Sequence, residues 1–326
     1  MIITRTPFRM SFFGGGTDLP SHFLKHGGAV LGTTFDKYCY VSVRHLTAFF
    51  DYSTELVYSK TERVRCVDQI QHPAIREAMR MVGVNDIRLS YEADLPARSG
   101  LGTSSSFAVG MLSALHGIKG EFRDKRALAD EAIHLERDLC HEAGGWQDQI
   151  AASFGGMNRI DFDSEGYRVT PIIMSTKRKK ELEERLLLFF TGFTRFSADV
   201  QKNIRFDKCA SRLEEMRSLV DAAQRILQDS TIPLSDFGVL LDRTWRLKRT
   251  IGESVTTEAI DLLYLRALSA GAVGGKLLGA GGGGFLLLYV EPENQERVRG
   301  AFPDLLEVPF AFENGGTQVT YYLAED

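Results

Sequence analysis

The chain has 326 residues, of which 44% are hydrophobic and 25% charged, and these proportions exclude a disordered, collagen-like or disulfide-rich protein. The formal net charge of -4 gives no general attraction to nucleic acid or to an anionic membrane, so we expect neither as a partner. The cysteines show no CxxC pair or zinc-like spacing, which indicates reduced thiols. Without a long apolar run or a signal-peptide pattern, we expect a cytoplasmic protein.

The first half of the chain mixes strands and helices. Apolar and β-branched residues predict a strand that Asp36 and Lys37 interrupt, and a recurrence at three and four residues predicts two helices further on. The predicted elements are strands at 29–43 and 89–95 and helices at 104–118 and 124–141.

Helices dominate the second half, although three strands are also predicted there. The elements in chain order are a strand at 184–192, helices at 213–227 and 260–271, a strand at 285–290, a short helix at 294–302 and a strand at 317–323. Because no regular βαβ alternation appears, the fold class is predicted as α+β. The length suits two domains, which we place at 1–170 and 171–326.

A glycine-rich turn at residues 96–106 is the strongest chemical signal. Gly100 and Gly102 allow the backbone to turn sharply before a predicted helix, whose first N–H groups favour an anion. The turn is followed by three hydroxyl residues that can cap the helix or hold a metal bound to phosphate, namely Thr103, Ser104 and Ser105. A loop with a serine cap is the simpler interpretation, but Arg98 favours phosphate. The Walker pattern is absent.

Two further glycine clusters occur near the ends of the chain. Residues 279–284 contain a formal GxGxxG, but a helix precedes these glycines and a strand follows them, which disfavours a nicotinamide site. Close packing against a ligand or another backbone explains them better than a simple turn. Near the start, Arg9 and Asp18 flank the glycines of residues 14–16.

Two carboxylates complete the candidate residues. Glu136 lies on the flank of an apolar helix stripe, where an unpartnered carboxylate is costly; a metal ion or cation is one interpretation and a solvent-exposed boundary position is the other. Asp148 follows a glycine pair and lies beside Trp146, an aromatic residue that can restrict water.

Taken together, these motifs resemble those of the GHMP family of small-molecule kinases. The matching segments are PFRMSFFGGGTD near the start, PARSGLGTSSS in the middle, WQDQ shortly after it, and KLLGAGGGGF near the end. The resemblance implies a two-domain α+β fold, with an N-terminal domain like that of certain ribosomal proteins and a ferredoxin-like C-terminal domain. It also implies an active site between the two domains.

The resemblance implies roles for the nucleotide-binding residues. The loop expected to surround the ATP phosphates comprises Arg98, Ser99, Gly100, Leu101, Gly102, Thr103, Ser104 and Ser105. Within this group Ser104, together with Glu136, would hold Mg²⁺. ATP and Mg²⁺ are therefore the expected cofactors.

For the acceptor, the resemblance places Asp148 at the reacting hydroxyl, with Arg9 stabilising Asp148 or the developing charge. The residues expected to bind substrate are Gly15, Gly16, Thr17, Asp18, Gly281 and Gly282. A phosphate on the substrate needs cations from outside the motifs, and we select Arg195 and Lys202, although either can be an ordinary surface charge.

The expected reaction is phosphorylation of the anomeric hydroxyl of a sugar phosphate. Galactokinases carry GEHTD where this chain has GGGTD, so we expect a roomier and less acidic pocket, suited to D-glycero-D-manno-heptose 7-phosphate. L-Fucokinase and galactokinase activities are the alternatives within the family. A nicotinamide-dependent oxidoreductase and a noncatalytic RNA-binding or scaffold protein are the alternatives outside it.

Overall fold

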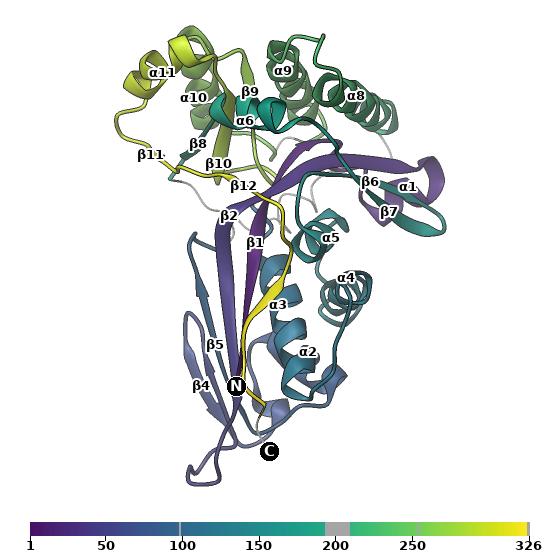
Figure 1. Ribbon diagram of the computed structural model, residues 1–326, viewed down its shortest axis with the longest axis vertical. Coiled ribbons are helices and arrows are strands. Elements are labelled where there is room, and N and C mark those ends of the chain that lie inside the picture. The colour runs from purple at the N-terminus through teal and green to yellow at the C-terminus, as the bar shows by residue number, and fades with distance from the viewer. Residues whose placement is uncertain (98, 193–208, 253, 325–326) are drawn as a thin grey trace.

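The structure of the protein is a computed structural model that describes residues 1–326 with the exception of 98, 193–208, 253 and 325–326. Two β-sheets lie one above the other along the long axis, and helices pack against both (Figure 1). Among the described residues the first sheet has nine strands and the second has four. This arrangement confirms the predicted α+β class.

The first sheet is built on two long antiparallel strands, β1 (Ile2–Phe13) and β2 (Gly28–His45). Their register shifts at Phe8, so Asp36 and Lys37 form a bulge where the sequence predicted an interruption. The strand β2 nevertheless continues through it. Further strands of this sheet are β3 (Thr54–Val57), β4 (Thr61–Val64), β5 (Ile87–Ala93), β6 (Asn158–Asp163) and β7 (Gly166–Pro171).

Helices cover one face of this sheet (Figure 1). They are α2 (Pro73–Val82), α3 (Thr103–Ile118), α4 (Lys125–Ile133) and α5 (Gln147–Phe154), and the shorter α1 (Pro20–His26) and η1 (Val67–Gln69) lie at its edges. The central helix α3 lies very close to β1, because a Cβ on Gly110 would be only 2.6 Å from Thr6 Oγ1. This close packing fixes where the start of α3 lies relative to β1.

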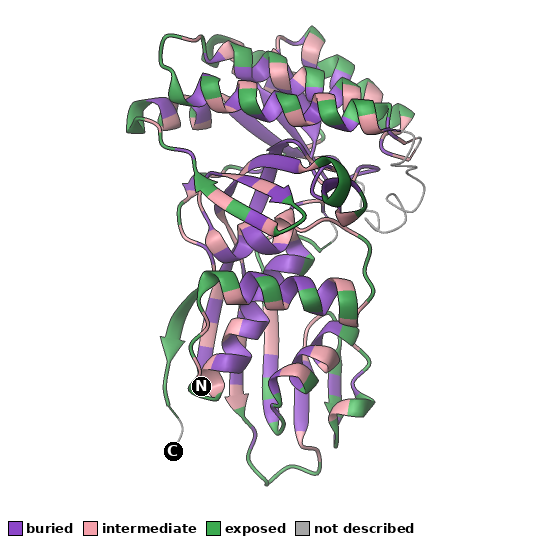
Figure 2. Ribbon diagram, turned by 90° about the vertical axis from the view of Figure 1, so that its right-hand side faces the viewer, coloured by how far each residue is buried: buried purple, intermediate pink, exposed green. Residues whose placement is uncertain are grey.

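The second sheet consists of apolar strands under a layer of helices whose outer faces are exposed (Figure 2). Its strands are β8 (Leu186–Phe190), β9 (Gly274–Leu277), β10 (Phe285–Tyr289) and β11 (Leu306–Glu307). The accompanying helices are α6 (Thr176–Glu184), α8 (Ala210–Gln228), α9 (Ser235–Arg249), α10 (Glu258–Ser269), α11 (Gln295–Ala301) and the short η4 (Pro292–Asn294).

One continuous apolar core joins the end of β1 to the second sheet and its helices. Phe12 and Phe13 each make an edge-to-face contact with Phe237 of α9, with ring centroids 5.3 and 5.0 Å apart. Lys276 of β9 reaches across the same junction and donates to the carbonyls of Ser11 and Phe12 at 2.7 and 2.9 Å. The first glycine cluster therefore begins at a firmly held point between the two sheets.

The chain after residue 310 returns to the first sheet. Strand β12 (Phe312–Glu313) pairs with β2, and β13 (Gln318–Tyr322) pairs with β1, so β13 forms one edge of that sheet. The strand predicted at 317–323 is confirmed, but its place beside β1 had no signal in the sequence. The first sheet thus takes strands from both sides of residue 170, and the domain limits at 1–170 and 171–326 stay a prediction.

Two predicted elements differ locally from the structure. The helix expected at 124–141 is α-helical only to Ile133 and continues as a π-helical segment, η2 (His134–Leu139). The glycines at 279–284 follow the short strand β9 rather than a helix, so they connect two strands. No helix in the described part of the chain is both long and apolar enough to cross a membrane.

Candidate active site

The glycine-rich turn before α3 packs without a side-chain cap. Gly100 and Gly102 have φ angles of +84° and +73°, values that glycine adopts without steric cost. Gly102 occupies the position before the helix and, being glycine, provides no side-chain cap for the first N–H groups of α3. Of the hydroxyls for which the sequence left two roles open, those of Ser104 and Ser105 are directed at a carboxylate.

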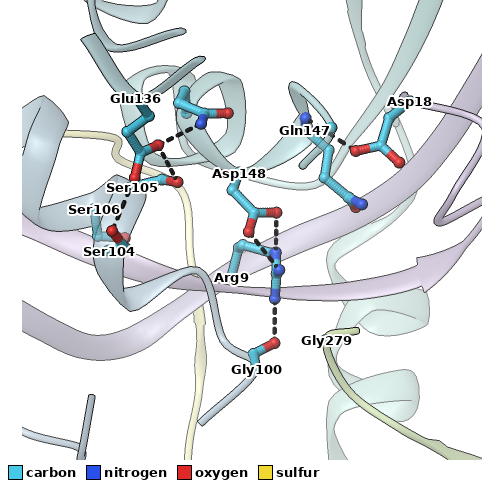
Figure 3. Close-up of polar contacts among 12 residues, drawn as sticks. Arg9, Asp18, Gly100, Ser104, Ser105, Ser106, Glu136, Gln147, Asp148 and Gly279 are labelled. Carbon is cyan, nitrogen blue, oxygen red and sulfur yellow. Dashed lines mark hydrogen bonds and ion pairs between the residues drawn. The ribbon is translucent and has the colours of Figure 1, made fainter. Parts of the chain in front are cut away.

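That carboxylate is Glu136, which is almost completely buried, with 1% of its surface exposed. Ser104 Oγ donates to Glu136 Oε1 at 2.9 Å and Ser105 Oγ donates to Oε2 at 2.7 Å, while Gln149 Nε2 also donates to Oε2 (Figure 3). The sequence left two environments open for Glu136, and the structure shows the buried one. The π-helical segment η2 carries this residue, and such segments are frequent at functional sites.

The second carboxylate, Asp148, is held by Arg9 of β1. Arg9 Nε and Nη2 donate to the two oxygens of Asp148 at 2.8 and 2.7 Å, and Arg9 Nη1 donates to the carbonyl of Gly100 at 2.6 Å (Figure 3). The side chain of Arg9 is 7% exposed and that of Asp148 is 25% exposed. The arginine thus connects the glycine turn to a carboxylate that retains access to ligands.

The first turn of α5 contacts residues of all three other parts of the site. Asp148 binds Arg9, the adjacent Gln149 binds Glu136, and the backbone N–H of Gln147 donates to Asp18 Oδ2 at 3.4 Å. Three motifs that are far apart in the sequence therefore meet at one helical turn.

Asp18 is buried and lies just after the N-terminal glycines, residues 14–16. Its Oδ1 accepts a hydrogen bond of 2.8 Å from the N–H of Gly16, and its carbonyl accepts one from Trp146. Burial, with a smaller contribution from the charge of Asp148, raises the pKa of the Asp18 carboxyl. Thr17 is fully buried and its hydroxyl bonds the carbonyls of Gly14 and Ala29, which fixes the turn from inside.

A side chain at Gly15 would meet only polar side-chain atoms, at ordinary contact distances. A Cβ on Gly15 would have Ser11 Oγ and Gln147 Nε2 at ordinary contact distances of 3.5 and 3.7 Å. Ser11 Oγ is buried and has no hydrogen-bond partner among the described residues. A polar ligand group at this position would satisfy it.

The third glycine cluster, residues 279–284, packs directly onto the glycine-rich turn before α3. A Cβ on Gly279 would be 2.4 Å from the Cα of Gly100, and one on Gly284 would be 2.2 Å from the carbonyl oxygen of Ser99. Leu101 is fully buried under the same loop. Of the two explanations that the sequence left open, the structure shows packing of backbone on backbone here.

Gly281 and Gly282, predicted to bind substrate, contact the backbone of Val255. A Cβ on Gly281 would be 2.4 Å from the carbonyl oxygen of Val255, and the N–H of Gly282 donates to that oxygen at 3.0 Å. Three other predicted binding residues, Arg98, Arg195 and Lys202, lie outside the described residues. Their predicted roles stay predictions.

A lysine that the sequence analysis did not identify also reaches the site. Lys248 of α9 is buried, and its Nζ donates to the carbonyl oxygen of Gly279. Its burial and the charge of Arg9 lower the pKa of Lys248 to about 8, although Asp18 and Asp148 act in the opposite direction. One signal was available: Lys248 continues the apolar stripe formed by Phe237, Leu241 and Trp245.

Comparison with known proteins gives a consistent result. Residues 65–156, which include the glycine turn, Glu136 and Asp148, match the model of the GHMP kinases N terminal domain. The chain is 29% identical over 316 residues to D-glycero-alpha-D-manno-heptose 7-phosphate kinase of Campylobacter jejuni, covering 89% of this chain and 90% of that protein.

Two further similarities concern a fucokinase and a solved structure. The chain is 26% identical to the bifunctional fucokinase/GDP-fucose pyrophosphorylase of Arabidopsis thaliana over 90% of its own length, but this covers only 30% of that protein. The crystal structure of a D-glycero-D-manno-heptose 1-phosphate kinase from Bacteroides thetaiotaomicron superposes with a TM-score of 0.81 at 23% identity, covering 99% of this chain and 100% of that one. At that identity the superposition shows the common fold.

Proposed function

We propose that this chain, a kinase of the GHMP family, transfers the γ-phosphoryl group of ATP to the anomeric hydroxyl of a sugar phosphate, D-glycero-D-manno-heptose 7-phosphate. The observation that carries the proposal is the first turn of α5. There, Asp148 carries the carboxylate that would face the acceptor and bonds Arg9, while the next residue, Gln149, donates to the buried carboxylate of Glu136 beside the glycine-rich turn.

The residues of the chain supply positioning and charge in this reaction. The acceptor oxygen forms a bond to the γ-phosphorus, the bond from that phosphorus to the bridging oxygen breaks, and ADP leaves. The proton of the acceptor hydroxyl passes to Asp148. Arg9 holds both oxygens of Asp148 and thereby fixes the direction from which the carboxylate meets the hydroxyl.

The donor set at Glu136 fits a magnesium ion. Ser104 Oγ and Glu136 Oε1 lie 2.9 Å apart. A serine hydroxyl and a carboxylate are both oxygen ligands of the kind that Mg²⁺ prefers, so these two groups would hold the ion. Because Mg²⁺ usually combines one or two protein ligands with substrate phosphates and water, its remaining ligands would come from the ATP phosphates and water. When bound, Mg²⁺ would neutralise charge on the ATP phosphates.

The N-terminal glycines, residues 14–16, support a substrate larger than an ordinary hexose. Gly15 and Gly16 stand where galactokinases carry Glu and His, and Gly15 is bordered by the unpartnered hydroxyl of Ser11. No carboxylate side chain stands on these three residues to repel a substrate phosphate. Similarity to the heptose kinase of C. jejuni along 89% of the chain supports the same substrate.

The other candidate activities have weaker support. Similarity to the plant fucokinase is lower, at 26% identity, and covers a smaller share of that protein. The glycines at 279–284 connect strand to strand, whereas the dinucleotide fingerprint needs a strand followed by a helix.

A coupled assay for ADP release tests the proposal, with Mg²⁺, ATP and four acceptors: heptose 7-phosphate, L-fucose, galactose and mannose. We expect turnover with the heptose 7-phosphate and a phosphorus NMR signal from a new anomeric phosphate. Turnover only with an unphosphorylated sugar would retain the kinase mechanism and reject the substrate. Absence of turnover with all four would reject the sugar kinase activity.

A further inference from the structure

Lys248 brings a buried positive charge to Gly279, within electrostatic reach of Arg9, Asp18 and Asp148. Its side chain is 7% exposed, and its Nζ donates to the carbonyl oxygen of Gly279. Gly279 packs against Gly100, whose own carbonyl oxygen accepts a hydrogen bond from Arg9. The ammonium group therefore lies one backbone contact away from the Arg9–Asp148 pair.

The charged groups around Lys248 come from four elements. Arg9 of β1 and Lys276 of β9 act as like charges, whereas Asp18, which precedes α1, and Asp148 of α5 attract the ammonium group. Among the described residues neither carboxylate is close enough to Lys248 to form an ion pair. The lysine is thus surrounded by charges that leave its own charge uncompensated, a state that is costly unless a ligand completes it.

A second buried lysine, Lys276, differs from Lys248 in how many acceptors its ammonium group has within the protein. Lys276 is 2% exposed and bonds two carbonyl oxygens, those of Ser11 and Phe12, which anchors β9 to β1. Within the described part of the chain, Lys248 has a single acceptor, the oxygen of Gly279, for an ammonium group with three N–H bonds. The difference indicates that Lys248 retains donors for a group that arrives with the substrates.

We propose that Lys248 is a catalytic residue that binds the phosphoryl group during its transfer from ATP to the acceptor. This inference rests on the proposed kinase function and adds a residue to it. The phosphoryl group carries its charge on three oxygens and must pass between the glycine loop and Asp148. An ammonium group already fixed at that place, in a site that is largely shielded from water, stabilises this charge without rearrangement.

The variants K248M and K248R test the proposal, with R246Q as a matched control. Methionine keeps most of the length and apolar surface of lysine without its charge, and arginine keeps a charge that does not titrate. Arg246 lies on the same helix, but it is exposed and pairs with Asp242. Melting temperatures of all three variants establish that they fold.

The first measurement is kcat from pH 6.5 to 9.5. We expect K248M to lower kcat by about 10²–10³-fold, the cost of removing one charge-stabilising donor, and R246Q to leave it unchanged. The wild-type kcat should fall as the pH rises through about 8, where Lys248 loses its proton. K248R should retain part of the activity and lack this decline. Wild-type kcat values in K248M, or the same decline in K248R, would overturn the proposal.

The second measurement is independent of turnover. ADP with magnesium and aluminium fluoride imitates the phosphoryl group in transfer, and calorimetry compares its affinity with that of ADP and magnesium alone. We expect K248M to weaken the fluoride complex by at least about tenfold, while the affinity for ADP changes by less than about threefold. Equal loss of both affinities would assign Lys248 a structural role. A wild type that forms the fluoride complex but phosphorylates no sugar would reject the proposed substrate and leave the role of Lys248 standing.

Discussion

Arg9 and Asp148, 139 positions apart in the sequence, share two hydrogen bonds of 2.8 and 2.7 Å, in which one edge of the guanidinium, Nε and Nη2, donates to both carboxylate oxygens. This paired geometry fixes the orientation of a carboxylate more firmly than a single contact with lysine does. Because β1 carries Arg9 and α5 carries Asp148, the pair also fixes α5 relative to the first sheet.

We predict that D148N lowers kcat by about 10²–10⁴-fold, the usual contribution of a positioned general base. Asparagine keeps the shape of the side chain but cannot accept the proton of the acceptor hydroxyl. The affinity for ATP should stay at the wild-type value, because the loop and Glu136 are unaltered. Single-turnover kinetics and ATP titration measure both quantities, and a variant with near-normal kcat would exclude the role of base.

Replacing Arg9 should destabilise the fold as well as the site. We predict that R9M lowers the free energy of unfolding by about 2 kcal/mol, less than the about 3–5 kcal/mol of a fully buried pair, because Asp148 is 25% exposed. Urea denaturation of R9M, D148N and the double variant measures the coupling between the two residues. Strictly additive effects would show that the pair contributes nothing.

The contact between Gly279 and Gly100 predicts a difference between two glycine substitutions. G279A places a Cβ 2.4 Å from the Cα of Gly100, whereas G120A, at a similar positive φ of +74° against +80°, meets nothing within 4 Å. We expect G120A to cost about 1 kcal/mol, from its backbone conformation alone. G279A should cost about 3 kcal/mol and also weaken ATP binding, because the loop must shift. Equal losses in the two variants would contradict the packing described here.

Removing the Ser104 hydroxyl should alter the dependence on magnesium. We predict that S104A raises the Mg²⁺ concentration needed for half-maximal activity by about tenfold, as expected for the loss of one oxygen ligand, which corresponds to about 1.4 kcal/mol. S106A is the matched control, since Ser106 Oγ bonds the carbonyl of Pro7 instead of Glu136. An unchanged Mg²⁺ requirement in S104A would remove the hydroxyl from the metal site.

Asp18 should make stability depend on pH. Burial raises its pKa above the value of 3.8, so the native state holds a proton that the unfolded state releases, and stability falls as the pH rises through this interval. D18N removes that contribution. The free energy of unfolding of D18N minus that of wild type should therefore increase from pH 4 to pH 7, which means that D18N gains stability relative to wild type, while the acceptor KM increases. A pH-independent difference would show that Asp18 titrates normally.

The motif residues were predictable because short segments carry their chemistry. The glycine turn before α3 was identified from its local pattern, and Arg9, Glu136 and Asp148 were assigned roles by the resemblance to the GHMP motifs; the structure places them together. Lys248 was not identified, since one charged residue on a helix usually faces solvent and its contact with Gly279 depends on the packing of α9 against β9. The π-helical turn at Glu136 likewise depends on tertiary contacts.

The pairing of β13 with β1 has a consequence for folding during synthesis, because the two strands come from opposite ends of the chain. Arg5 and Gln318, 313 positions apart, lie side by side in the first sheet, and β12 supplies another pairing to β2. During synthesis, β1 therefore emerges long before its outer neighbour and presents an unpaired edge of backbone groups in the meantime. Fragments that stop before residue 312 should associate through that edge, so expression of residues 1–170 alone is expected to yield aggregates rather than a stable domain.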